Sequence, residues 1–127
     1  MSWKNLALPL AAATLMLSSI TASTTEVVRM PKALRGMWDQ GPTACKLHLS
    51  PDSQSPIWIE GANLRGYERK DVPIKVNRLL REPAVWVIVS VDSDLAPDIS
   101  STDIFVLKGD TLTITDGRLS SDYRRCK

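Results

Sequence analysis

The chain has 127 residues and is nearly balanced in charge, with 16 lysines and arginines against 14 aspartates and glutamates. The charges are interspersed along the sequence, which argues against a nucleic-acid-binding or membrane-surface protein, because both need a basic cluster. The length is sufficient for one domain with a single modest hydrophobic core.

The first 23 residues show the order of features that is typical of a secretory signal. A positive charge at Lys4 precedes an apolar stretch from Leu6 to Leu17, and small polar residues follow from Ser18. The apolar stretch is too short to cross a membrane, which takes about 20 apolar residues. We therefore expect residues 1–23 to be removed and residues 24–127 to fold as one periplasmic or secreted domain. An amphipathic or buried N-terminal helix is the alternative.

Helix signals are scarce in the expected mature domain. Residues 31–35 predict a single helical turn that begins at Pro31. Residues 77–82 (NRLLRE) predict either a short helix before Pro83 or a bent continuation of a strand.

Two cysteines, Cys45 and Cys126, allow one intramolecular pairing. In an exported protein an even number of cysteines indicates a disulfide. Closing such a long loop stabilises a domain by about 4 kcal/mol in the chain-entropy account. A metal-binding thiol pair is the weaker alternative, because His48 is the one histidine and three such ligands do not complete a usual zinc site.

Alternation of apolar and polar residues with a period of two predicts half-buried strands. In PIWIE, Ile57 and Ile59 are expected on one face. In DVPIKV, the residues expected on one face are Val72, Ile74 and Val76.

The second half of the domain predicts further strands. Residues 84–91 (AVWVIVSV) are apolar on both faces, which favours a central strand that is covered on two sides. Residues 103–126 predict two or three strands, with turns at Gly109 and Gly117. The spacing of strands and turns indicates an all-β fold, a single small antiparallel up-and-down barrel of about 7–8 strands. Closure into a barrel removes the exposed sheet edges.

The opening of the domain, PKALRGMWD, places Gly36, Met37 and Trp38 directly after the expected helical turn. This stretch resembles the G-x-W opening of lipocalins and related calycin barrels. The resemblance implies that Trp38 lies at the closed end of the barrel and that Arg124 or Arg125, from the last strand, packs across it. The chain is also similar to small exported bacterial proteins of uncharacterised function that open with P-x-x-L-R-G-x-W and end with Y-x-R-C. A core tryptophan and a solvated basic tail are the alternative interpretation.

Residues with catalytic or metal-binding chemistry are few. The common nucleophile, zinc, phosphate-loop and dinucleotide motifs do not occur in the sequence, so we expect no enzyme activity, no cofactor and no metal. His48 is interpreted as a solvated surface residue. Glu60 and Glu68 are interpreted as part of a charged outer face rather than as a glycosidase pair.

The acidic segment VDSDLAPDISSTD superficially resembles a calcium loop. Asp92, Asp94, Asp98 and Asp103 occupy the first, third, seventh and twelfth positions. Such loops need glycine at the sixth position and a bidentate glutamate at the twelfth, whereas Pro97 and an aspartate stand there. We interpret the segment as a solvated hairpin loop.

Because the sequence argues against an enzyme and against a nucleic-acid-binding protein, we expect the function to be the binding of a ligand or a protein partner. We expect a non-catalytic exported binding protein of lipocalin-like type that takes a small apolar ligand, with Trp58, Tyr67 and Trp86 as candidate lining residues. The alternative is a protein inhibitor or immunity-type protein whose partner is an exported hydrolase. A barrel filled by its own side chains favours the second class and an open mouth favours the first. In both cases we expect a monomer without nucleic-acid or membrane contacts after the signal is removed.

Overall fold

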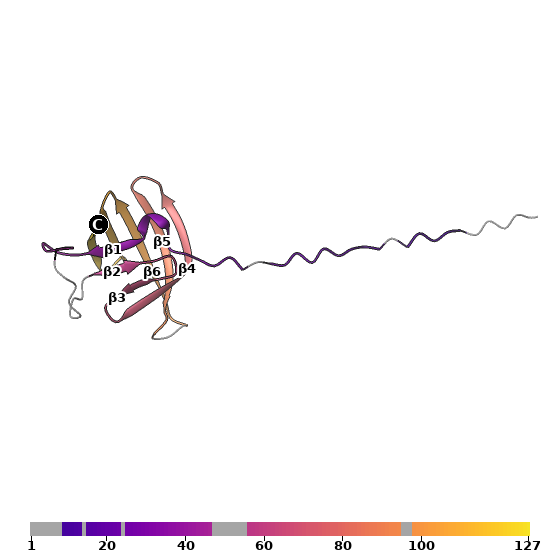
Figure 1. Cartoon of the computed structure of the whole chain (residues 1–127), viewed down its shortest axis with the longest axis horizontal. Helices are drawn as coiled ribbons and strands as arrows, with labels where there is room; N and C mark the ends of the chain where they lie inside the picture. The colour runs from indigo at the N-terminus through magenta and orange to yellow at the C-terminus, as the bar shows by residue number, and fades with distance from the viewer. Residues whose placement is uncertain (1–8, 14, 24, 47–55, 95–97) are drawn as a thin grey trace, which may run out of the picture.

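The computed structural model describes residues 9–13, 15–23, 25–46, 56–94 and 98–127. Eight antiparallel strands form one closed barrel, in which sequence neighbours pair and the last strand pairs with the first (Figure 1). The expected fold class, an all-β up-and-down barrel, is therefore confirmed.

The strands are short in the first half of the domain and longer in the second. In chain order they are β1 (Gly36–Asp39), β2 (Ile57–Ile59), β3 (Leu64–Gly66), β4 (Arg69–Leu80), β5 (Ala84–Asp92), β6 (Ser100–Lys108), β7 (Thr111–Thr115) and β8 (Ser120–Arg125). One 3-10 turn, η1 (Lys32–Leu34), precedes β1 with Pro31 at its N-cap, which confirms the expected helical turn. The part of the chain that the structure describes contains no α-helix.

Strand β5 shows how the barrel uses the two faces of a strand. Its inner residues Trp86 and Ile88 are buried, whereas Val87 and Val89 on the outer face are partly exposed. The expectation that this strand is covered on two sides is wrong, because a closed barrel has one inner face and no described segment forms a second layer over it. The strand is central only in the sense that β4 and β6 flank it.

Strand β4 departs from strict alternation. The register between β4 and β5 shifts between Pro73 and Lys75. After the shift, Val76 packs against the core, whereas Ile74 is half exposed. The expectation that Val72, Ile74 and Val76 share one face is therefore wrong, because an extra residue in one strand turns the following side chains to the other face.

The remaining sequence signals between strands fall into turns. Strand β4 continues to Leu80, so the bent-strand interpretation of residues 77–80 is correct and the short helix is wrong. The turns expected at Gly109 and Gly117 are confirmed, with φ of 59° and 91°. These left-handed conformations favour glycine over residues with a side chain.

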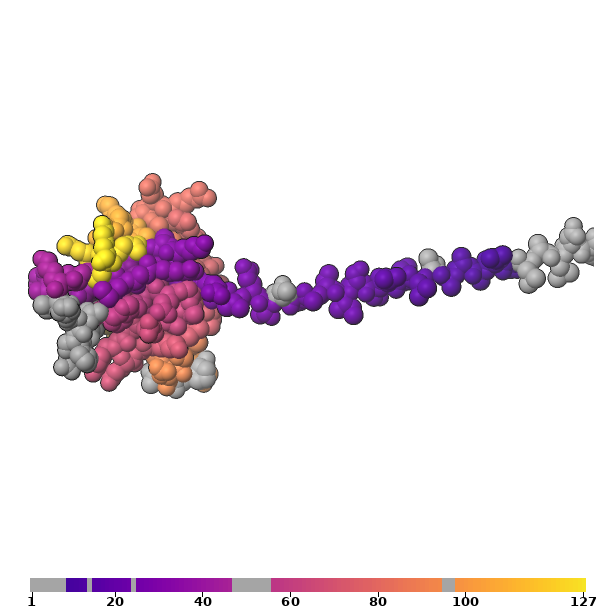
Figure 2. Space-filling model, viewed as in Figure 1, coloured from indigo at the N-terminus to yellow at the C-terminus, as the bar shows by residue number. Residues whose placement is uncertain are grey.

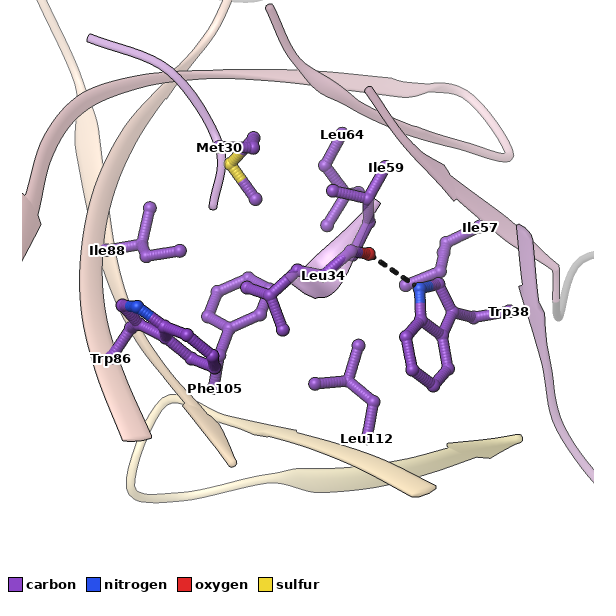
Figure 3. Packing of buried hydrophobic residues seen from close by; sticks show 10 residues of the cluster. All are labelled: Met30, Leu34, Trp38, Ile57, Ile59, Leu64, Trp86, Ile88, Phe105 and Leu112. Carbon is purple, nitrogen blue, oxygen red and sulfur yellow. Dashed lines mark hydrogen bonds between the residues drawn. The ribbon is translucent and has the colours of Figure 1, made fainter. Parts of the chain in front are cut away.

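The hydrophobic core lies in the interior of the barrel (Figure 3). Its buried members are Met30, Leu34, Trp38, Ile57, Ile59, Leu64, Trp86, Ile88, Phe105 and Leu112. Met30 and Leu34 come from the segment before β1 and lie among side chains from the strands, so this segment acts as a plug. Burial of these apolar surfaces is the main stabilising term of the domain.

The N-terminal segment lies outside the barrel. Residues 9–13 and 15–23 have no regular secondary structure and extend away from the domain (Figures 1 and 2). Their large apolar side chains are exposed, among them Leu10, Leu17 and Ile20. In the described ranges, no helix is long and apolar enough to cross a membrane. The secretory signal stays a prediction.

Candidate functional site

One end of the barrel, here called the closed end, is sealed by η1 and Trp38. The Trp38 ring is fully buried, and its Nε1 donates a hydrogen bond of 2.8 Å to the Leu34 carbonyl oxygen. The Arg125 guanidinium lies over this ring, 4.2 Å from its centroid, which is the geometry of a cation–π contact. Arg124 is exposed on the other face of β8. Of the two arginines that the resemblance left open, Arg125 is the one that packs on the tryptophan.

Arg125 also joins the end of the chain to the start of the domain. Its Nη1 donates to the Arg35 carbonyl oxygen at 3.0 Å, and its Nη2 donates to the Ala33 carbonyl oxygen at 2.8 Å. Its Nε lies 3.5 Å from Asp110 Oδ1. Gly36 has a φ of 133°, which disfavours a residue with a side chain at the point where η1 enters β1.

The disulfide between Cys45 and Cys126 is confirmed, with a Cα–Cα distance of 5.3 Å. Cys45 lies in a turn after β1 and has a left-handed φ of 63°. The Asp39 carboxylate fixes this turn by accepting a hydrogen bond of 2.9 Å from the Cys45 amide. The Cys126 amide donates to the Met37 carbonyl oxygen at 2.9 Å. The C-terminal residues therefore lie against the start of the domain (Figure 2, yellow against purple).

The opposite end of the barrel, here called the open end, is hollow. A cavity of about 220 Å³ opens there. Its lining comes from six strands and the β7–β8 turn and comprises Ile57, Leu64, Arg69, Asp103, Ile114, Asp116, Leu119, Ser121 and Tyr123. Apolar residues and charged residues line the cavity together. A concave site of this kind is where small ligands bind in barrels.

Arg69 is positioned in the cavity by its neighbours on β3 and β4. A Cβ atom on Gly66 would lie 3.2 Å from Arg69 Cγ, so the glycine leaves room for the arginine stem. Arg69 Nε donates a hydrogen bond of 2.9 Å to Asp71 Oδ2, and its Nη2 contacts the same oxygen. Burial lowers the pKa of Arg69, but the hydrogen bond and the charge of Asp71 outweigh it and leave this pKa raised. The guanidinium is thus charged and committed to Asp71.

Asp103 projects from β6 into the same cavity. Burial raises the pKa of its carboxyl group, and the nearby Asp71 and Asp116 raise it further, while Arg69 opposes this effect. No side chain or main-chain amide in the described ranges donates a hydrogen bond to Asp103. A partly buried carboxylate without a donor is an unfavourable arrangement that a ligand can relieve.

Tyr123 on β8 forms the wall beside these charges. Burial raises the pKa of its hydroxyl group, while the charge of Arg69 and a hydrogen bond with Ser121 lower it. The hydroxyl is therefore neutral at physiological pH and serves as a hydrogen-bond donor or acceptor.

The β7–β8 turn forms part of the rim. Asp116 Oδ1 accepts hydrogen bonds of 2.8 Å from the amides of Arg118 and Leu119. The bond from Leu119 and then that from Arg118 lower the pKa of Asp116, so this carboxylate is charged and fixed in place. Asp116 thus places a fixed negative charge at this part of the rim.

The aromatic residues expected to line a ligand site lie elsewhere. Trp58 is partly exposed in β2, whose neighbours Ile57 and Ile59 point inward. Tyr67 is 46% exposed in the β3–β4 turn. Trp86 is buried in the filled half of the barrel, with the Arg78 guanidinium 5.2 Å from its ring centroid. None of the three lines the cavity at the open end.

Other residues singled out in the sequence are separated. Glu60 pairs with Arg65 at 2.6 Å near one end of β3, and Glu68 lies beyond the other end. The structure does not bring these two glutamates together. His48 lies outside the described residues.

The acidic segment contributes a single residue to the cavity lining. Asp103 enters the cavity, whereas the Asp94 amide donates to Asp92 Oδ1 at 2.9 Å in a local turn. Residues 95–97 lie outside the described ranges. In those ranges, no three histidine, cysteine or acidic residues are grouped so that they would hold a metal ion.

Sequence reasoning missed the lining residues Arg69, Asp103 and Tyr123. A signal was present, because Asp103 lies two residues before the core residue Phe105 and therefore on the same face of β6. Tyr123 stands in the same relation to Arg125. The period of two therefore places Asp103 and Tyr123 on the inner face once Phe105 and Arg125 are known to point inward.

Comparison with known proteins adds no family. No protein-family model, curated protein or solved structure matches the chain.

Proposed function

We propose that this protein is a non-catalytic exported binding protein of lipocalin-like type, and that its ligand enters the open end of the barrel. The observation that carries the proposal is the cavity of about 220 Å³ at one end of a barrel whose other end is filled by its own side chains. A barrel that is filled at one end and hollow at the other combines a stable scaffold with a concave site.

The lining favours a small ligand with both polar and apolar parts. Ile57, Leu64 and Ile114 offer an apolar surface, while Arg69 and Asp103 offer charge. A wholly apolar ligand would desolvate the Asp103 carboxylate without giving it a hydrogen-bond partner, which costs free energy. The proposed ligand therefore differs from the small apolar molecule expected from the sequence, because it carries a polar group as well.

Two features support export to the periplasm or the exterior. The disulfide between Cys45 and Cys126 forms in oxidising compartments. The apolar residues of the N-terminal segment that the structure describes are exposed and do not pack on the barrel, as expected for a leader that is removed.

Native mass spectrometry of the protein isolated from its exported location tests the proposal. The expected result is a small molecule bound in a 1:1 ratio. Ser121→Phe places a large ring in the cavity and should abolish this mass increment, because Ser121 lines the cavity. Ser120→Phe is the matched control, since Ser120 is exposed on the other face of β8.

Two results would contradict the proposal. Loss of the small molecule from both variants, or from neither, would show that it does not occupy the cavity. Isolation of a stoichiometric protein instead of a small molecule would favour the inhibitor or immunity-type alternative.

A further inference from the structure

The charges at the open end indicate a ligand class, and this inference rests on the proposed function. We propose that the cavity selects a small organic cation, a primary ammonium compound with a short apolar tail, whose ammonium group binds the Asp103 carboxylate.

The charge balance at the cavity is negative. Among the described residues that line the cavity, Arg69 is the one with a positive charge, whereas Asp103 and Asp116 are negatively charged. Asp71 adds a third carboxylate in contact with Arg69. Arg118 lies in the exposed turn after Asp116 and does not line the cavity. One positive charge against three negative charges attracts a cation and repels an anion.

The single guanidinium does not provide an anion site. Arg69 directs both its Nε and its Nη2 at Asp71, and the Asp71 side chain is 12% exposed. An anionic ligand would have to share this guanidinium with Asp71 and would face Asp103 at the same time. Two carboxylates at one site disfavour each other's charged forms.

Asp103 is the group that a cation would satisfy. It is partly buried and receives no hydrogen bond from the described residues, in contrast to Asp71 and Asp116, which accept bonds from Arg69 and from the β7–β8 turn. An ammonium group supplies three donors and a positive charge, so it provides the hydrogen bonds that this carboxylate lacks and adds to the attraction of Arg69.

The rest of the lining suits the remainder of such a molecule. The Tyr123 ring is available for a contact with the ammonium group, and the apolar residues Ile57, Leu64 and Ile114 line the same cavity. A cavity of about 220 Å³ accepts a short alkyl chain rather than a lipid.

The rim extends the negative surface beyond the cavity. A neighbouring groove shares Arg69 and Asp103 with the cavity and adds Glu68 and Asp92. These two carboxylates lie on the β3–β4 turn and at the end of β5. Their charge steers a cation toward Asp103 and weakens as the salt concentration rises.

Titration with three probes of matched shape, n-butylammonium, n-butanol and butanoate, tests the proposal by amide NMR. We expect n-butylammonium to shift the signals of Asp103 and Tyr123 at concentrations where the other two probes do not. Asp103→Asn should weaken binding of n-butylammonium by about tenfold or more, the effect of losing one charge-assisted hydrogen bond. Asp122→Asn, on the outer face of β8, should leave it unchanged.

The outcomes separate this proposal from the proposed function. Equal binding of all three probes, preference for butanoate, or unchanged affinity in Asp103→Asn would overturn the cation class while leaving the cavity as a ligand site. Absence of shifts with every probe would also overturn it, and the mass-spectrometric comparison of Ser121→Phe with Ser120→Phe would then decide the proposed function on its own.

Discussion

The closed end and the open end are built from the same strands but treat their charged groups in opposite ways. At the closed end, the Arg125 guanidinium lies against the Trp38 ring and donates to two backbone carbonyl oxygens. At the open end, Asp103 lies among other carboxylates without a donor from the described residues. Strand β8 serves both ends, because Arg125 and Tyr123 lie two residues apart on its inner face. Satisfied polar groups stabilise a fold, and unsatisfied ones are available to a ligand.

This difference predicts a division of roles between the two ends. Substitutions at the closed end should lower the free energy of unfolding and leave the cavity lining intact. Substitutions at the open end should change binding with little loss of stability. Each of the following predictions tests one side of that division.

Trp38→Ala is expected to have the largest effect. Removing a fully buried indole from the core should lower the free energy of unfolding by about 3 to 5 kcal/mol, because it leaves a cavity and removes the surface under Arg125. Urea unfolding measures this loss. Trp58→Ala is the matched control, since Trp58 is partly exposed and should cost much less. Equal costs for the two tryptophans would contradict the assignment of Trp38 as the seal of the barrel.

Cys126→Ser is expected to have the second largest effect on stability. The disulfide joins residues separated by 81 positions, and its loss should lower stability by about 2 to 5 kcal/mol. Thermal unfolding of the variant and of the reduced wild-type protein should give the same shift. If reduction leaves the melting temperature unchanged, the bond does not fasten the end of the chain to its beginning.

Arg125→Met should lower the free energy of unfolding by less than Trp38→Ala or Cys126→Ser does. A double-mutant cycle with Trp38→Ala should give a coupling of about 0.5 to 2 kcal/mol for the cation–π contact. Arg124→Met in the same cycle should give no coupling, because Arg124 is exposed on the opposite face. Coupling through Arg124 instead would contradict the observed placement of the two arginines.

The barrel itself was predictable from the sequence because its strands alternate and its turns contain glycine. The register of β4 was not predictable from the alternation of its residues. Its shift between Pro73 and Lys75 reverses the faces of the following residues, and Pro73, a residue that strands tolerate at bulges, is the local sign of this irregularity that the period of two does not show. The exposure of the outer face of β5 was not predictable for a different reason: Val87 and Val89 are as apolar as core residues, although they lie on the outer face of the barrel.

The closed end was predictable and the open end was not, for a physical reason. A tryptophan and a basic residue at the two ends of the domain carry a recognisable pattern. The open end is assembled from polar residues on β4, β6 and β8, which are far apart in the chain and are individually typical of a solvated surface. Only the closure of the barrel brings Arg69, Asp103 and Tyr123 together.

Asp103→Asn is expected to have the smallest effect on the free energy of unfolding. The effect should be a gain at neutral pH, whereas the substitutions at the closed end should all cause a loss. Burial raises the pKa of Asp103 in the folded protein, so the native state binds this proton more tightly than the unfolded chain does. The contribution of Asp103 to stability is therefore greatest below the ordinary aspartate pKa of about 3.9 and is lost as the pH rises through the folded-state pKa.

An asparagine does not titrate, so the variant should match the wild-type protein in acid and exceed its stability at neutral pH. The gain should stay below about 1 kcal/mol because the carboxylate is partly solvated. Urea unfolding of both proteins from about pH 3 to pH 7 measures it, with Asp122→Asn as the surface control. A stable variant that has lost its preference for n-butylammonium would show that Asp103 is retained at a cost in stability for the sake of binding. A variant that is less stable than wild type at neutral pH would instead show that Asp103 supports the fold, and the division between the two ends would fail.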